Sequence, residues 1–161
     1  VRAYVAMRIA FVEQCPTAIQ GDPAYMRRVP LSRWRTLVRE LATSTKCAAY
    51  LALHDGTPVG FANASTNAET NEAEITHIWV AAEARRTGIG RLLLSAALQT
   101  ATTYPVARVS LWVTTTNQPA RQLYKALGLR PTRNFRLLAP GSSLKQIKYV
   151  LSPRLPTKRN S

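Results

Sequence analysis

The fold is decided by Glu74-Ile-Thr-His-Ile-Trp-Val80 and by the segment that follows it, Ala81-Ala-Glu-Ala-Arg-Arg-Thr-Gly-Ile-Gly90. The first segment is rich in β-branched and aromatic residues, which favour a strand. From the second segment onward, residues on one face recur at helical spacing, namely Ile89, Leu92, Leu93, Ala96, Ala97 and Thr100. The chain is therefore predicted to form a strand, an arginine- and glycine-bearing turn, and a helix, in that order.

The start of this helix has the features of an anion site. A helix start leaves about four backbone N–H groups without intrahelical partners and carries about half a positive charge. A phosphate group binds readily there. Gly88 and Gly90 let the backbone approach a ligand closely, and Arg85, Arg86 and Arg91 add positive charge. The turn is therefore predicted to bind phosphate.

The apolar positions of the strand change their parity along its length. Ala73 and Ile75 lie on one face of a regular strand, whereas Ile78 and Val80 fall on the other. A one-residue β-bulge near Thr76 to Ile78 would explain the change. A bulge leaves backbone groups unpaired, so they become available to a ligand beside the phosphate turn.

Composition and length bound the classes of protein to which the chain can belong. Its 161 residues fit one domain, predicted over residues 1–152, followed by a basic and flexible tail at 153–161. The net charge of +14 attracts anions, including nucleic acid and phosphorylated cofactors. Two cysteines, Cys15 and Cys47, make neither a disulfide framework nor a metal site, so we expect a reducing cytoplasm. No apolar run approaches the roughly 18 residues of a membrane span, and no signal peptide is visible.

The rest of the chain reads as alternating helices and strands. Residues 1–14 fit either a strand or a helix, of which a helix is favoured, and Cys15 to Pro30 reads as an irregular connection with a short helical turn. The remaining predicted elements are a helix capped by Ser32 (32–42), a hairpin around Asp55-Gly56 (48–54 and 58–65), a helix (89–103), a strand (106–114), a helix from Asn117 to Gly128, and two closing strands (129–138 and 144–151).

Two motifs together resemble the GNAT superfamily of N-acetyltransferases. Arg85-Arg-Thr-Gly-Ile-Gly90 fits the family's Arg/Gln-x-x-Gly-x-Gly/Ala, and it follows a strand as that family requires. Asn117-Gln-Pro-Ala-Arg-Gln-Leu-Tyr-Lys-Ala-Leu-Gly-Leu129 is similar to the family's Asn-x-x-Ala-x-x-Leu-Tyr-x-x-x-Gly-Phe. The resemblance extends from about Ala48 to Leu151. The chain departs from the family at Arg86, where many members carry Gly, and in lacking a strand before residues 1–14.

The resemblance implies a fold and an activity. The implied fold is α/β (α+β), with a mixed, mostly antiparallel sheet of six to seven strands, about four flanking helices, a splayed strand pair and a β-bulge. The implied activity is direct transfer of the acetyl group of acetyl-CoA to a primary amine, without a metal. Acetyl-CoA and an amine acceptor would be the partners, and a homodimer is open.

The resemblance also implies roles for individual residues. Tyr124 would give a proton to the leaving thiolate, and Glu74 would deprotonate the amine through water, with His77 as the competing base. Backbone N–H near Trp79 or Val80 would hold the oxyanion. Acetyl-CoA would contact the strand end (Ile78, Trp79, Val80), the turn (Arg85, Arg86, Thr87, Gly88, Ile89, Gly90, Arg91), and the second motif (Asn117, Arg121).

Other functions stay open at the level of the sequence. The arginine-rich surface also fits a basic nucleic-acid-binding module, although no such motif is present and the basic residues are scattered. A CoA-binding sensor without catalysis is a further alternative. No motif identifies the acceptor: the acidic residues Glu69, Glu72 and Glu74 would attract a cationic amine, whereas the charge of +14 argues against polycations. Trp34 and Trp112 are expected in the core.

Overall fold

The computed structural model describes residues 1–15 and 22–152. The predicted tail at 153–161 lies outside them, as does part of the connection after Cys15. In chain order the elements are α1 (Arg2–Gln14), α2 (Pro23–Arg28), α3 (Leu31–Thr43), β1 (Cys47–His54), β2 (Thr57–Asn67), β3 (Glu72–Val80), the 3₁₀ turn η1 (Ala82–Ala84), α4 (Ile89–Ala101), β4 (Arg108–Thr114), α5 (Gln118–Ala126), β5 (Arg130–Leu137) and β6 (Lys145–Leu151). The helix favoured at the N-terminus is therefore confirmed.

The strands form one mixed sheet in the order β1-β2-β3-β4-β6-β5. Every neighbouring pair is antiparallel except β3 and β4, which run parallel. The parallel pairing covers only Glu72 to Glu74 of β3 against Arg108 to Ser110 of β4, and beyond these residues the two strands part. The predicted fold class is confirmed, including the mostly antiparallel sheet and its splayed strand pair.

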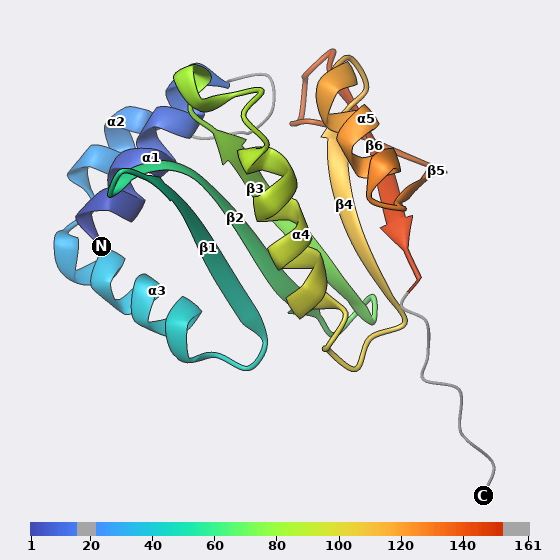
Figure 1. The fold of residues 1–161 in the computed structure, drawn as a ribbon, viewed down its shortest axis with the longest axis horizontal. Coiled ribbons are helices and arrows are strands. Elements are labelled where there is room, and N and C mark those ends of the chain that lie inside the picture. Colours follow the sequence, from blue (N-terminus) through green and yellow to red (C-terminus); the bar gives the residue numbers. More distant parts are fainter. Residues whose placement is uncertain (16–21, 153–161) are drawn as a thin grey trace, which may run out of the picture.

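Different helices lie beside different parts of the sheet. In Figure 1, α4 crosses in front of β2 and β3, whereas α1, α2 and α3 gather beside β1 and β2. The helix α5 lies over the other half of the sheet, beside β4 and β6. The parting of β3 and β4 therefore falls between the half of the sheet covered by α4 and the half covered by α5.

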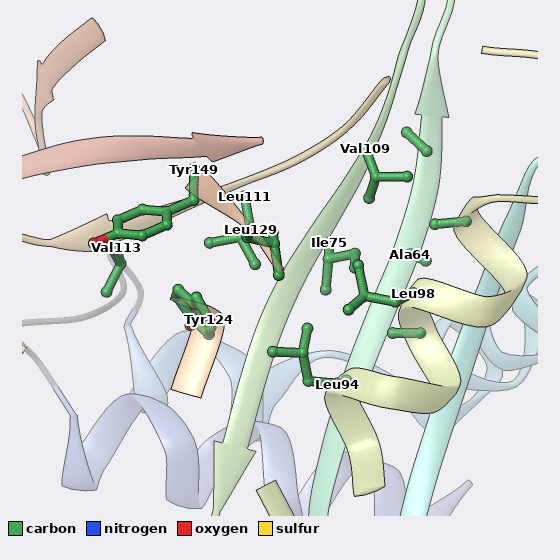
Figure 2. Packing of buried hydrophobic residues seen from close by; sticks show 14 of the residues in the cluster. Ala64, Ile75, Leu94, Leu98, Val109, Leu111, Val113, Tyr124, Leu129 and Tyr149 are labelled. Atoms are coloured by element: carbon green, nitrogen blue, oxygen red, sulfur yellow. The ribbon is translucent and has the colours of Figure 1, made fainter. Parts of the chain in front are cut away.

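Two hydrophobic clusters fill the space between the sheet and its helices. The larger cluster joins Leu94 and Leu98 of α4 to Ile75 of β3, and it continues through Leu111 to Tyr124 of α5 (Figure 2). The smaller cluster lies under α1 and contains Met7, Phe11, Phe61, Trp79 and Ala81. Burying these side chains supplies most of the driving force for folding, at about 25 cal/mol per Å² of apolar surface.

The predicted bulge in β3 is confirmed. Phe61 pairs with Trp79 and Asn63 with Thr76, so Ala62 alone faces the two residues His77 and Ile78. The extra residue reverses the parity of the strand. Before the bulge Ile75 faces the larger cluster, and after it Ile78 faces the same cluster while Trp79 enters the smaller one.

The predicted start of α3 needs correction. The helix α3 begins at Leu31 with Pro30 as its N-cap, two residues before the cap predicted at Ser32. Proline is tolerated there because its fixed φ suits a helix start and no partner is needed for a missing N–H. Trp34 is buried as expected, whereas Leu37 is 38% exposed.

Among the described helices, none is long and apolar enough to cross a membrane.

Candidate active site

The turn between β3 and α4 presents a row of free backbone donors. Within residues 1–15 and 22–152, no acceptor pairs with the N–H groups from Arg86 to Gly90. Gly88 caps the helix with a φ of 92°, and the Thr87 hydroxyl donates to the carbonyl of Ala84 at 2.7 Å, which closes the turn. Aligned N–H groups and the positive end of the helix dipole together favour an anion.

The backbone of this turn places different demands on Gly90 and Arg86. A methyl group added at Gly90 would lie 3.7 Å from both Leu123 and Val80, an ordinary contact, so packing within the protein does not demand a glycine there. Arg86 has a φ of 70°. This left-handed conformation costs a residue other than glycine about 1–2 kcal/mol. The preference of the resembled family for glycine at this position therefore has a backbone reason.

The three arginines around the turn are not equivalent. The Nε of Arg85 donates to the carbonyl of Val80 at 3.0 Å, and its Nη2 lies 3.8 Å from the sulfur of Cys15. Arg85 therefore ties the turn to β3 and to the end of α1. The side chains of Arg86 and Arg91 are exposed and have no partner among the described residues, so their charges face solvent beside the free N–H groups.

The bulge residue His77 sits in an unusual position for a histidine. Its φ of 55° is left-handed, and its ring stacks on Phe61 and meets Phe11 edge to face. Its Nδ1 lies 2.9 Å from the Thr76 hydroxyl. Burial, reinforced by the positive charge of Arg8, lowers the pKa of His77 to about 4. The imidazole is therefore neutral at pH 7 and is a weak base.

A cleft of about 220 Å³ opens where β3 and β4 part. Of the residues predicted for the site, it brings together Glu74, Ile78, Asn117 and Tyr124, with His77 beside them. The turn between β3 and α4 adjoins it, because Gly90 lies between Val80 at the end of β3 and Leu123 of α5. The other lining residues are Phe11, Ile75, Thr76, Leu111, Trp112, Val113, Thr114, Arg136, Leu138 and Gln146.

Tyr124 is held deep in this cleft with 6% of its surface exposed. The end of α5 fixes it: the N–H of Leu129 bonds the carbonyl of Tyr124, and the N–H of Gly128 bonds that of Lys125. This is the Schellman arrangement, made possible by the φ of 88° at Gly128. Burial raises the pKa of Tyr124 above its ordinary value, and Tyr149 adds to the rise. The phenol therefore keeps its proton and is a donor.

Three predicted cofactor residues have their side chains partly or wholly committed to the fold. The Oδ1 of Asn117 accepts from the N–H of Ala120 at 3.2 Å and caps α5, which leaves its Nδ2 for the cleft. Arg121 donates to the carbonyl of Thr115 at 2.8 Å and to the hydroxyl of Tyr149 at 3.3 Å. The indole of Trp79 is buried under α1, so only its backbone is available to a ligand.

Glu72 is not the free acidic group that the sequence suggested. It is 4% exposed, and its oxygens bind Arg108 at 2.7 Å, Lys148 at 2.5 Å and the Ser110 hydroxyl at 2.8 Å. Burial alone would raise the pKa of Glu72, but these partners outweigh burial and hold it below the ordinary value. In the described part of the chain, no three His, Cys, Asp or Glu side chains gather as metal ligands.

Sequence reasoning also missed one wall of the cleft. Trp112, expected in the core, lines the cleft with the guanidinium carbon of Arg136 4.3 Å from its ring centre. The Nε of Arg136 donates to Gln146 at 2.8 Å. The alternation of β4 carried the signal, since Leu111 and Val113 fill the core and Trp112 between them must face the other side.

Comparisons with known proteins agree with this geometry. The model of the acetyltransferase (GNAT) family matches residues 12–129. No curated protein matches the chain in sequence. A ribosomal-protein-alanine N-acetyltransferase from Brucella melitensis is 19% identical over 94% of this chain and 93% of its own, with a TM-score of 0.75.

Two further solved structures have the same fold. A GNAT acetyltransferase from Streptococcus pneumoniae is 20% identical over 78% of this chain and 77% of its own, with a TM-score of 0.68. A candidate streptothricin acetyltransferase from Bacillus anthracis, solved in complex with acetyl coenzyme A, is 24% identical over 71% and 67% of the two chains, with a TM-score of 0.61. The match of the family model over most of the chain identifies it as a member of the GNAT acetyltransferase family, whose members in general transfer an acetyl group from acetyl-CoA.

Proposed function

We propose that the chain is an N-acetyltransferase that moves the acetyl group of acetyl-CoA directly to a primary amine. The observation that carries this proposal is the parting of β3 and β4 into one cleft that holds both Glu74 and the buried phenol of Tyr124. The free N–H groups of the phosphate turn adjoin the same cleft. A cytoplasmic location and a homodimer stay predictions.

The residues present fit acetyl-CoA. Its pyrophosphate would lie on the N–H groups from Arg86 to Gly90, with the charges of Arg86 and Arg91 beside it. Its pantetheine arm would follow the edge of β3 from Ile78 to Val80, which β4 leaves unpaired, and would reach the Nδ2 of Asn117. The commitments of Arg85 and Arg121 give these two arginines the role of holding the site in shape.

The reaction needs two proton transfers by this chain. Acetyl-CoA supplies the thioester carbonyl and, once the new amide has formed, a thiolate. Glu74 would take a proton from the incoming ammonium group through water, since its carboxylate lines the cleft, whereas the imidazole of His77 stacks on Phe61 and its Nδ1 lies against the Thr76 hydroxyl. Tyr124 would protonate the sulfur, because burial keeps its phenol neutral. Backbone N–H near Trp79 or Val80 would stabilise the oxyanion.

Thiol release from acetyl-CoA in the presence of an amine panel tests the proposal. Tyr124→Phe should lower kcat by about 10²–10⁴-fold, the usual contribution of a positioned acid, and leave acetyl-CoA binding intact. The matched control is Tyr104→Phe, which removes a hydroxyl that does not line the cleft. Turnover that is the same in Tyr124→Phe and the parent would refute the proton-donor role, and the absence of amine-dependent thiol release would refute the activity.

The acceptor is not carried over from the structural neighbours. By their names, one acts on a ribosomal-protein alanine and another on streptothricin, so the shared fold admits very different amines. The acceptor class therefore has to be inferred from the residues that line this chain's own cleft.

A further inference from the structure

One wall of the cleft carries the charges that an acceptor would meet. Glu74 on β3, Trp112 on β4 and Arg136 on β5 all line it. Glu74 alternates with Ala73 and Ile75, and Trp112 with Leu111 and Val113, all of which are buried in the larger cluster. The side chains of Glu74 and Trp112 therefore lie on the face of the sheet away from α4 and α5, and the guanidinium of Arg136 lies over the ring of Trp112.

Arg136 is fixed in place yet has donors to spare. Its guanidinium lies over the ring of Trp112, and its Nε is bonded to Gln146. Both contacts restrict the side chain. Among the described residues, no acceptor bonds Nη1 or Nη2, so two parallel donors remain. A planar guanidinium with two free nitrogens suits a carboxylate, which it can bind in bidentate fashion.

Glu74 and Arg136 line the same cleft without forming an ion pair. The negative charge of Glu74 acts on Arg136, but within residues 1–15 and 22–152 the two form no ion pair at 4 Å or less. Glu72 does not change this balance, because Arg108 and Lys148 neutralise it. The cleft lining therefore presents one carboxylate and one guanidinium, separated by a gap.

We propose that the acceptor is an α-amino acid, a small molecule that carries a primary ammonium and a carboxylate on the same carbon atom. This inference rests on the proposed N-acetyltransferase function and names its substrate class. The ammonium would lie at Glu74, and the carboxylate would bind Nη1 and Nη2 of Arg136. Each charge of the acceptor then meets the opposite charge of the cleft.

With the acceptor placed in this way, every proton and bond of the acetyl transfer is accounted for. The ammonium loses one proton to water held by Glu74, and the neutral nitrogen forms the N–C bond as the C–S bond breaks. Tyr124 gives its proton to the departing sulfur and recovers the second proton released by the nitrogen. The products are the N-acetyl amino acid, the free thiol and one proton.

Other acceptors fit these charges less well. A polyamine or an aminoglycoside would bring further positive charges toward Arg136, with Glu74 as the one carboxylate among the lining residues. A peptide N-terminus would offer Arg136 a neutral carbonyl, which makes a weaker hydrogen bond than a carboxylate. These two classes are the alternatives that the experiment must separate.

The experiment uses matched acceptor sets and measures kcat/KM for thiol release. Each set contains an amino acid, its amide and its decarboxylated amine, for example leucine, leucinamide and isoamylamine, with phenylalanine and serine sets beside it. The parent should prefer the amino acid by about tenfold or more, as expected for a charge-assisted hydrogen bond. Arg136→Gln should abolish that preference, and Arg136→Lys should restore only part of it.

Arg133→Gln is the control, because Arg133 lies on the same strand, is exposed and does not line the cleft. It should keep the preference of the parent. Equal or better use of the amides, amines or an N-terminal peptide would overturn the amino-acid assignment while leaving the acetyltransferase in place. Persistence of the preference in Arg136→Gln would overturn the role of Arg136. Failure of every amine tested would refute the proposed function itself and the acceptor class with it.

Discussion

The substitution Gly90→Ala should affect the stability of the protein and its affinity for acetyl-CoA in opposite directions. Gly90 is the second residue of α4 and has no unusual φ. The methyl of alanine would lie 3.7 Å from Leu123 and Val80, so it would fit without displacing a neighbour. In the proposed complex, however, the pyrophosphate of acetyl-CoA would lie on the N–H groups of this turn, and that of Gly90 is one of them.

The two effects have opposite signs. Replacing glycine by alanine in a helix stabilises it by roughly 0.5–1 kcal/mol, so Tm should rise by about 1–4 °C. Forcing a methyl group into a fitted contact with the ligand costs about 1–3 kcal/mol, so the Kd for acetyl-CoA should rise by about 5- to 150-fold. The variant should be more stable and bind more weakly.

Thermal unfolding with and without acetyl-CoA measures both effects. At 100 times the parent Kd the ligand should stabilise the parent by about 2.7 kcal/mol, and a tenfold weaker variant by about 1.4 kcal/mol. Gly88→Ala is the control in the same turn. Its added methyl group would meet no atom within 4 Å, but alanine would have to adopt a φ of 92°, so the Tm of this variant should fall. A Gly90→Ala variant that binds acetyl-CoA as tightly as the parent would refute the close approach at Gly90.

Three further predictions concern stability and are each checked by urea unfolding. Gly60→Ala should destabilise the fold by about 1–3 kcal/mol, because its methyl would lie 2.8 Å from the backbone oxygen of Trp79; an unchanged free energy of unfolding would contradict this. Lys148→Met should cost about 1.5–3 kcal/mol at pH 7, since it removes one charged partner of the buried Glu72 while Arg108 remains; a Lys145→Met control should be near neutral. The pKa of His77 falls from 6.5 unfolded to about 4 folded, so stability should be lost as pH falls from about 7 toward 4, by up to about 3 kcal/mol. His77→Asn tolerates the same left-handed backbone and should flatten that dependence; equal slopes between pH 7 and 5 would show that His77 is not its source.

Local patterns in the sequence predicted the elements and the bulge. The parity change between Ile75 and Ile78 located the bulge because side chains alternate strictly along a strand. Two cap signals were also sound: Asn117 caps α5, and Gly128 ends it in the left-handed conformation. The cap at Ser32 was wrong, since Pro30 can begin a helix without any side-chain bond. The sequence could not reveal that the extra residue of the bulge, His77, takes a positive φ.

The ion pairs of Glu72 and the contact of Arg136 with Trp112 could not be predicted, because they depend on pairing between strands that are distant in the sequence. Glu72, Arg108 and Lys148 meet only because β4 lies between β3 and β6. Arg136 reaches Trp112 only across β6, in a register that includes an irregularity between Pro131 and Phe135. The position of the glycine-bearing turn at 85–90 and that of Tyr124 on α5 needed no such information, since each belongs to one contiguous motif.

The short parallel pairing of β3 and β4 makes the sheet a V whose two arms are joined at one foot. Glu72 lies at that foot and bridges three strands through Arg108 and Lys148, while Glu74 is the last paired residue before the arms separate. The two strands are therefore joined at one end, by backbone pairing and by buried ion pairs, and they open at the other end into the cleft that holds Tyr124.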